Sequence, residues 1–222
     1  GLYRVSTTDA VAGGVSLLGG FYGGELSADE RNPAENPVYI TAWDGPIEFD
    51  TSGSNPTRVD GLRFVLSPTH VLRFQSDAFV QRCVFTRLNT ITAPAPVELA
   101  GSGLAEFRNN LFAGCGGRAA DTVAGQCGSL IFVNNTVVRN GYQGAESGTS
   151  EGGILNVQSD NATIANNVFA WNARLLVSGT APDISSNVRW STESDGGWND
   201  LILDPLFVDD SAGRDYRLKG QS

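Results

Sequence analysis

The chain has 222 residues, the length of a single domain, and its 15 Lys and Arg against 24 Asp and Glu give a formal net charge of −9 at pH 7. This acidic balance argues against binding to nucleic-acid phosphates or to anionic membrane surfaces. The 41% hydrophobic content is too high for a disordered chain, and no apolar run reaches the roughly 20 residues that span a bilayer. The 27 glycines indicate many turns and few long helices.

The chain is expected to form one domain over residues 1–222. Residues 1–58 are the least regular part and are predicted to form the first coils or a cap. They include a glycine-rich stretch, 19–24, that lacks the Lys-Ser/Thr pair of a phosphate-binding P-loop and is expected to form a turn. Residues 59–190 are predicted to form regular coils, and residues 191–222 a closing coil.

A repeat runs through residues 59–190. It can be anchored on one column of positions, spaced 20 to 32 residues apart: Leu62, Cys83, Asn110, Asn135, Asn167 and Asn187. The residue three positions before the anchor is apolar in every copy, and the residue two positions after it is apolar in all but the last. A short polar link, often Asn-Asn, separates the two. This pattern is typical of a strand, a turn and a second strand, and internal similarity at this period predicts a solenoid.

Further short strands are expected before several of the copies, at 71–74, 96–99, 153–157 and 174–177. Each repeat then carries about three short strands joined by sharp turns, which predicts an all-β fold, a parallel β-helix. At roughly 25 residues per coil, the chain would make about seven to nine coils. The unequal spacing implies loops of different length, the longest near 118–126 and 143–153.

Asn110, Asn135, Asn167 and Asn187 are predicted to form a structural ladder at one corner of the coils. Asparagine tolerates a left-handed backbone, and its amide can bond to the turn above or below. Such bonds would satisfy buried backbone groups that strand pairing leaves unpaired. A catalytic role for these residues is the weaker interpretation.

These strand repeats resemble the right-handed parallel β-helix superfamily typified by pectate lyases. The segments 14–25 and 31–38 resemble the first coils of bacterial surface β-helix proteins, often called choice-of-anchor proteins. The segment 204–209, followed by 215–218, resembles their closing coil. The resemblance implies a right-handed coil, export, and a place at the cell surface or outside the cell. It implies no particular activity, because a fold hosts many functions.

No catalytic residue is predicted. Pectate-lyase-like and glycosidase chemistry on this fold would need acids aligned on adjacent coils, and the aligned columns hold only scattered ones. Asp209, Asp210 and Asp215 could hold a Ca²⁺ ion through oxygen ligands, but a solvated acidic turn is the favoured interpretation. His70, the single histidine, has no evident partner and is expected to be a surface or turn residue.

A binding groove for acidic sugars could involve Arg87, Arg139 and Trp171. These residues stand in one column, four positions after the anchor, and combine guanidinium forks with an indole for stacking. The alternative is a set of scattered surface residues. We favour it, because Gly114 interrupts the column.

The three cysteines are Cys83, Cys115 and Cys127. Cys115 and Cys127 bracket a loop rich in glycine and alanine, and a disulfide between them is the favoured prediction in an exported protein. The alternative is three free buried thiols. The spacing does not fit a zinc site.

The sequence therefore favours a non-catalytic structural or adhesive element, exported or at the cell surface. Its partners would be other copies of itself, joined through open β-helix ends, or members of a larger complex. The alternative is a protein that binds or cleaves polysaccharide. No cofactor is expected beyond the Ca²⁺ considered above, and no nucleic acid or membrane span is expected.

Overall fold

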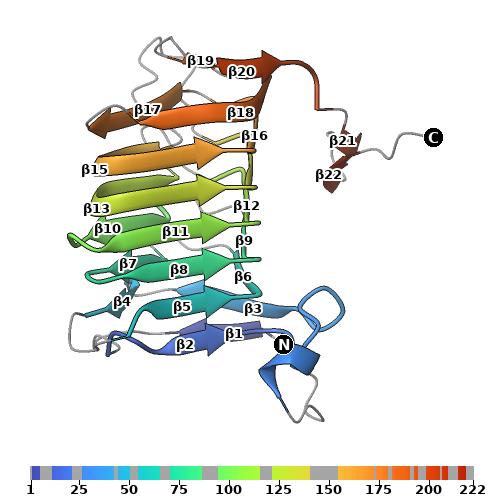
Figure 1. Ribbon diagram of the computed structural model, residues 1–222. Coiled ribbons are helices and arrows are strands. Elements are labelled where there is room, and N and C mark those ends of the chain that lie inside the picture. The colour runs from blue at the N-terminus through green and yellow to red at the C-terminus, as the bar shows by residue number, and fades with distance from the viewer. Residues whose placement is uncertain are drawn as a thin grey trace.

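Short parallel strands, stacked from the N-terminal to the C-terminal part of the chain, make up nearly the whole computed structural model (Figure 1). It describes residues 2–5, 12–21, 27–42, 45–50, 55–65, 71–86, 95–115, 122–140, 155–172, 174–179, 182–190, 193–194, 199–205, 207–209 and 215–218. A 20-stranded sheet wraps around one apolar interior, and its adjacent strands pair in parallel. The architecture is that of a parallel β-helix.

The strands fall into three stacks, named here by the order in which the chain visits them. Stack 1 holds β4 (Ile47–Phe49), β7 (Leu72–Phe74), β10 (Val97–Ala100), the first parts of β13 (Val123–Val133) and β15 (Leu155–Ala165), β17 (Arg174–Gly179) and β19 (Glu193–Ser194).

Stack 2 holds β2 (Ser16–Leu18), β5 (Thr57–Asp60), β8 (Ala78–Gln81), β11 (Leu104–Arg108), the second parts of β13 and β15, and the starts of β18 (Asp183–Trp190) and β20 (Asn199–Ile202). Stack 3 holds β1 (Leu2–Val5), β3 (Val38–Ala42), β6 (Leu62–Val65), β9 (Val84–Thr86), β12 (Leu111–Ala113), β14 (Thr136–Val138), β16 (Val168–Ala170) and the ends of β18 and β20.

The described strands make eight successive turns, from β2–β3 to β19–β20, as the predicted seven to nine coils require. A short 3-10 helix, Ala28–Glu30, lies in the segment between β2 and β3, which projects from the side of the solenoid. After the last turn, β21 (Phe207–Asp209) and β22 (Asp215–Leu218) pair in an antiparallel hairpin beside the solenoid. In the part of the chain that is described, no helix is long and apolar enough to cross a membrane.

The register of the strands confirms the predicted columns. The column three positions before the anchor runs in parallel register from Val59 through Phe107 to Ile184. In the column two positions after the anchor, Phe64, Phe85 and Phe112 stack with ring centroids 4.9 Å and 4.7 Å apart. Equivalent side chains of successive turns therefore pack on one another, because parallel strands in register bring them about 4.8 Å apart.

The asparagine ladder is confirmed, at the corner between stacks 2 and 3. The side-chain oxygen of Asn135 accepts hydrogen bonds from the backbone N–H and the side-chain amide of Asn110, at 2.9 Å and 3.0 Å. In the same way, the side-chain oxygen of Asn167 accepts from Asn135, and that of Asn187 accepts from Asn167. Each amide also donates to a carbonyl of the stack 2 strand in the preceding turn, as Asn135 does to Phe107 of β11 at 3.0 Å.

The left-handed backbone expected at the ladder asparagine lies instead at the residue before it. Asn109, Asn134 and Asn166 have φ of 55°, 56° and 57°, whereas none of the ladder residues has a positive φ. The two asparagines of each Asn-Asn pair thus have different tasks. The first makes the bend at the surface, and the second is buried and bonds to the neighbouring turns.

A second ladder, not predicted from the sequence, occupies the corner between stack 3 and the next turn. The side-chain oxygen of Asn140 accepts from the backbone N–H of Cys115 at 2.7 Å, and that of Asn172 accepts from the backbone N–H and side-chain amide of Asn140. These residues lie five positions after the anchors of their repeats. The residues before them, Gly114, Arg139 and Trp171, again have positive φ.

We predict that Asn135→Leu destabilises the fold far more than Asn134→Gly. The leucine leaves the backbone N–H of Asn110 and the carbonyl of Phe107 buried without partners, which costs about 1–3 kcal/mol for each group. Glycine at position 134 keeps the left-handed bend. Thermal unfolding followed by circular dichroism should show a melting temperature lower by about 5–10 °C for Asn135→Leu. Equal melting temperatures in the two variants would argue against the ladder.

Candidate functional site

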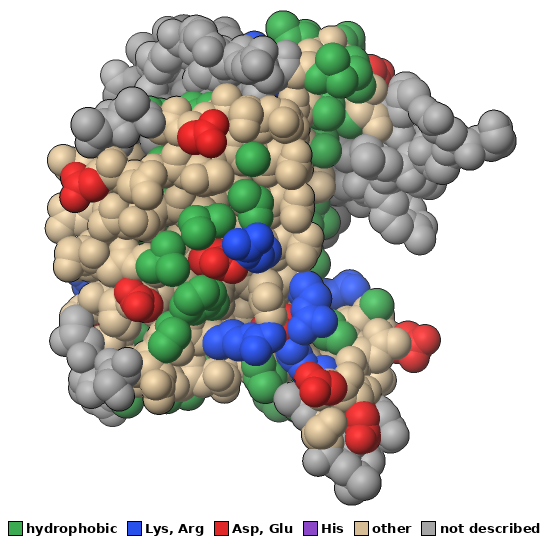
Figure 2. Space-filling model, viewed as in Figure 1, with side chains coloured by type: hydrophobic (Ala, Val, Ile, Leu, Met, Phe, Trp, Pro, Cys, Tyr) green, Lys and Arg blue, Asp and Glu red, His purple; other side chains and the backbone are tan. Residues whose placement is uncertain are grey.

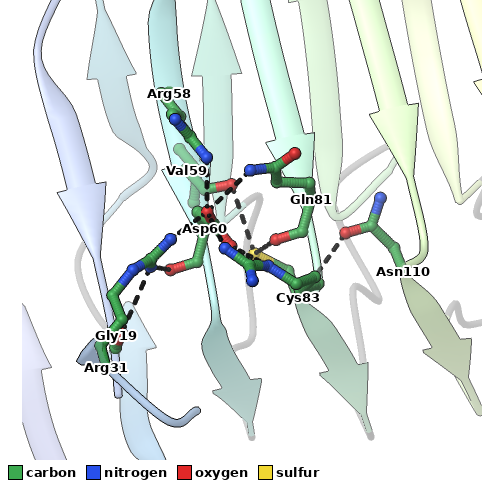
Figure 3. Close-up of polar contacts among 9 residues, drawn as sticks. Gly19, Arg31, Arg58, Val59, Asp60, Gln81, Cys83 and Asn110 are labelled. Atoms are coloured by element: carbon green, nitrogen blue, oxygen red, sulfur yellow. Dashed lines mark hydrogen bonds and ion pairs between the residues drawn. The ribbon is translucent and has the colours of Figure 1, made fainter. Parts of the chain in front are cut away.

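Three arginines converge on one buried carboxylate at the end of β5 (Figure 3). Asp60 has no exposed side-chain surface. Its Oδ2 accepts from Arg82 Nη2 at 2.6 Å, Gln81 Nε2 at 2.7 Å and Arg58 Nη2 at 3.0 Å, and from Arg31 Nη2. Its Oδ1 accepts from Arg82 Nε at 2.9 Å. This group is called the arginine cluster below.

The solenoid itself positions most of the arginine cluster. Arg58 and Asp60 lie on the outer side of β5, since they alternate with the buried Thr57 and Val59. Gln81 is the parallel partner of Asp60 in the next turn, and Arg82 follows it at the corner with φ of 53°. The left-handed backbone at Arg82 marks the same corner position that Asn109, Asn134 and Asn166 occupy in later turns.

Arg31 comes from the projecting segment between β2 and β3. Its Nη1 donates to the carbonyls of Asp60, at 3.3 Å, and Gly19, at 3.4 Å, and its side chain is only 5% exposed. The segment packs closely on two glycines. A Cβ on Gly20 would lie 2.6 Å from the nitrogen of Pro33, and one on Gly61 would lie 2.6 Å from its Cγ. The sequence motifs 14–25 and 31–38 therefore meet in space at Asp60 and Gly61.

The charges of the cluster do not balance. Burial alone would raise the pKa of Asp60, but hydrogen bonds from Arg82, Arg31 and Gln81 and the positive charge of Arg31 hold the pKa well below its usual value. Asp60 is therefore ionised and neutralises one of the three guanidinium groups. Arg58 and Arg82 are 47% and 48% exposed. Figure 2 shows basic side chains gathered where the projecting segment meets the solenoid.

Other carboxylates on the outer faces are also paired with arginine. Arg73 on β7 lies between Glu48 on β4 and Glu98 on β10, at 3.4 Å and 3.5 Å, and so links three successive turns of stack 1. Arg108 pairs with Glu106 within β11. These pairs place opposite charges at short range on the outer surface of the solenoid.

Two of the three residues predicted to line a binding groove lie together. The Arg139 guanidinium is stacked over the ring of Trp171, 5.2 Å from its centroid, and the two residues occupy one corner in successive turns. Arg139 is exposed and Trp171 is half-buried. Gly114 takes the same corner position one turn earlier, as the column predicted. Arg87 lies outside the described residues.

The predicted Ca²⁺ site falls on the C-terminal hairpin. The backbone register places Asp209 of β21 opposite Asp215 of β22, while Asp210 and the side chains of all three residues lie outside what is described. No group of three or more His, Cys, Asp or Glu residues elsewhere in the described chain is arranged to hold a metal ion. His70 also lies outside the described residues.

The predicted Cys115–Cys127 disulfide is wrong, because all three cysteines are buried thiols that take part in no disulfide. Cys115 lies at the corner before the stack 1 strand of its turn, where its Sγ is 3.3 Å from the carbonyl oxygen of Phe85. Cys127 lies at the corner after that strand, in register with Ser159. A strand separates the two positions, whereas a disulfide needs Cα atoms within about 7 Å. Burial raises the pKa of the Cys83 thiol to about 12 and also raises that of Cys127.

A cavity of about 340 Å³ lies near the N-terminal turns, lined by aromatic and polar residues that include Tyr3, Phe21, Glu35 and Tyr39. Arg63 lies over the Tyr39 ring, 5.6 Å from its centroid. Neither this cavity nor the arginine cluster was predicted from the sequence. The sequence did contain a signal for the cluster. Arg58 and Arg82 lie near the anchors of neighbouring repeats, and Asp60 is the single acid in the column two positions before the anchor. The contribution of Arg31 could not be predicted, because it depends on how the projecting segment folds back.

No family model, no curated protein and no solved structure matches this chain. Its architecture is established by the strand pairing and register described above.

We predict that Asp60→Asn lowers the unfolding free energy at pH 7 by about 3 kcal/mol, since it leaves three guanidinium groups without their buried counter-ion. Because the pKa of Asp60 is lowered on folding, its stabilising effect is complete above its usual pKa of 3.8 and is lost gradually as the pH falls from there through the lower folded pKa. Urea unfolding should therefore show a smaller difference in unfolding free energy between wild type and Asp60→Asn at pH 3 than at pH 7.

Glu106→Gln is the matched control for Asp60→Asn. Its partner Arg108 is 41% exposed, so the loss of this pair should cost less than about 1 kcal/mol. A constant difference between wild type and Asp60→Asn across this pH range would show that the charge of Asp60 does not stabilise the fold.

Proposed function

We propose that this chain is a non-catalytic structural or adhesive β-helix that works at the cell surface or outside the cell. One observation carries the proposal. In the described turns, the buried carboxylate and amide side chains form hydrogen bonds and ion pairs that join one turn of the solenoid to the next.

The ion pairs and the amide ladders support this interpretation. Asp60 receives hydrogen bonds from Arg82 in the following turn and from Arg31 in the preceding segment, and Arg73 links three turns of stack 1. A general acid needs a pKa raised toward neutrality. The pKa of Asp60 is moved the opposite way, so this carboxylate is suited to structure and not to proton transfer.

Membership in the pectate-lyase-like superfamily, and in its choice-of-anchor group, is part of the proposal. What supports it is the parallel β-helix together with the meeting of the motifs 14–25 and 31–38 at Gly61. The close packing of Pro33 against Gly20 and Gly61 gives these motifs a physical reason: a side chain at either glycine would displace the projecting segment.

Self-association through the two ends of the solenoid is also part of the proposal. β20 pairs with β18, and its Leu201 and Ile202 are 59% and 69% exposed. β1 pairs with β3, and its Tyr3 is 59% exposed. Strand edges that carry exposed apolar side chains favour pairing with another chain.

Two measurements on the purified chain test the proposal. Negative-stain electron microscopy over a range of concentrations should show rods that lengthen into filaments, because the end strands of one copy meet those of another. Incubation with a panel of acidic and neutral polysaccharides, with and without Ca²⁺, should release neither reducing ends nor unsaturated products. Turnover of any of these polysaccharides would overturn the non-catalytic function. Rods of constant length at all concentrations would overturn the end-to-end assembly.

Binding of acidic polysaccharide is a second candidate function, favoured by the Arg139–Trp171 stack. The pair presents a guanidinium group and an indole on successive turns, a combination suited to the carboxylate and the ring of a uronate. Gly114 shows that this corner accepts glycine, so Trp171→Gly keeps the left-handed backbone while removing the ring.

We predict that Trp171→Gly and Arg139→Gly reduce retention on polygalacturonate about tenfold if this surface binds sugar, since each removes about 1.4 kcal/mol of contact. Affinity electrophoresis gives the retention directly. Asn134→Gly, at another left-handed corner, is the matched control and should migrate as wild type. Equal retention of all the proteins would remove Arg139 and Trp171 from the binding surface.

A further inference from the structure

The arginine cluster holds more hydrogen-bond donors than its carboxylate can accept. Four nitrogen atoms lie at hydrogen-bonding distance from Asp60 Oδ2, from Arg31, Arg58, Gln81 and Arg82. A carboxylate offers about four lone-pair sites over both of its oxygens. The donors of the cluster therefore exceed the acceptors that Asp60 can supply.

The charges of the cluster point the same way. Arg31 and Asp60 form a buried ion pair, and Arg58 and Arg82 add two further positive charges at the surface beside it. The whole chain is acidic, with a formal net charge of −9, so this pair of positive charges is a local reversal of sign. A dianion would neutralise it, whereas a single carboxylate of a ligand would leave one charge unbalanced.

The exposed side of the cluster belongs to Arg58 and Arg82. Each is about half exposed, and each uses only part of its donor set on Asp60: Arg58 through Nη2, and Arg82 through Nε and Nη2. Each guanidinium has five N–H donors in a planar fork that matches the oxygens of a phosphate. Within the described chain, neither side chain has another partner that competes for the remaining N–H groups.

The two guanidinium groups are close enough for one anion to bridge them. Arg58 Nη2 and Arg82 Nη2 lie 3.0 Å and 2.6 Å from the same oxygen of Asp60, so a single oxygen atom already bonds to both. Arg31 is 5% exposed and is fixed by hydrogen bonds to the carbonyls of Gly19 and Asp60. It therefore adds positive charge on the buried side of the cluster but cannot contact a ligand directly.

From this geometry we propose that Arg58 and Arg82 form a binding site for a dianionic phosphate group, with Asp60 and Arg31 holding the two forks in place. The site lies where the projecting segment meets stack 2 and is open to solvent on that side (Figure 2). It is distinct from the Arg139–Trp171 surface and does not depend on the proposed structural function. The phosphate could be free in solution or carried by a sugar.

Isothermal titration at low ionic strength tests the site with four probes: inorganic phosphate, glucose 6-phosphate, sulfate and acetate. We expect saturable binding of one phosphate per chain, similar binding of sulfate, and binding of acetate at least about tenfold weaker, because a monoanion balances half of the charge. Tighter binding of glucose 6-phosphate than of inorganic phosphate would identify a sugar-borne group, and the reverse would identify the free anion. Absence of saturable phosphate binding, or acetate binding as tight as phosphate binding, would overturn the proposal.

The pH dependence distinguishes phosphate from sulfate. A phosphate monoester gains its second charge near pH 6, whereas sulfate is a dianion throughout. Binding of glucose 6-phosphate should therefore weaken between about pH 7.5 and pH 5 while binding of sulfate stays constant. Parallel behaviour of the two probes would show that the site does not select the dianion.

Variants separate the site from the fold. Arg58→Gln and Arg82→Asn should each weaken phosphate binding about tenfold, since each removes a charge-assisted fork. Asparagine suits the left-handed backbone at position 82, as Asn109 shows in the next turn. Arg58→Lys keeps the charge without the fork and should weaken binding less than Arg58→Gln.

Arg73→Gln, on stack 1, is the control and should bind phosphate as wild type. Melting temperatures measured without phosphate would show that each variant is folded. Unchanged phosphate binding in folded Arg58→Gln and Arg82→Asn would overturn the assignment.

Discussion

Each corner of this solenoid bends the chain away from its neighbours, so backbone N–H and C=O groups at the corner need partners that strand pairing cannot supply. Buried asparagine side chains provide them. Asn135 accepts from the backbone and the side chain of Asn110, while its own amide donates to Phe107 and Asn167. The stacking of strands, the register of the phenylalanines and the spacing of the turns all depend on this satisfaction of the corner backbone, because an unsatisfied buried group costs as much as several favourable contacts gain.

The corner has a second requirement, a residue with a left-handed backbone. In three repeats an exposed asparagine meets it, at Asn109, Asn134 and Asn166. At the other corners the residue is Gly61, Arg82, Gly114, Arg139, Trp171 or Ser186. Apart from the buried Gly61, these positions are exposed or partly exposed. The solenoid can therefore vary them without disturbing its interior, and two of its notable surface features, the arginine cluster and the Arg139–Trp171 stack, both use residues at such corners.

The N-terminal turns differ from the rest because a projecting segment is fastened to them by charge. Arg31 reaches under the corner of the next turn and bonds to Asp60, and Pro33 lies against Gly20 and Gly61. This arrangement covers a carboxylate that would otherwise lie on the outer face of β5. It also leaves Arg58 and Arg82 with donors directed to solvent, so one network both holds the segment and creates the positive surface proposed here to take phosphate.

The sequence by itself determined the parallel β-helix, the three-strand turn and the asparagine ladder, because side chains that stack in successive turns repeat in aligned columns. The spacing alone placed the columns from Val59 to Ile184 and from Phe64 to Phe169, and the strand register confirms both. The second ladder was present in the same alignment, at Asn140 and Asn172, but only two described asparagines carry it. Only the tertiary structure decided the contacts made between columns or by irregular segments. It separated Cys115 from Cys127 by a strand, and it brought Arg31 to Asp60 across 29 positions of sequence. Such contacts depend on the path of the chain in space, and they leave no repeating pattern in the sequence from which they could be predicted.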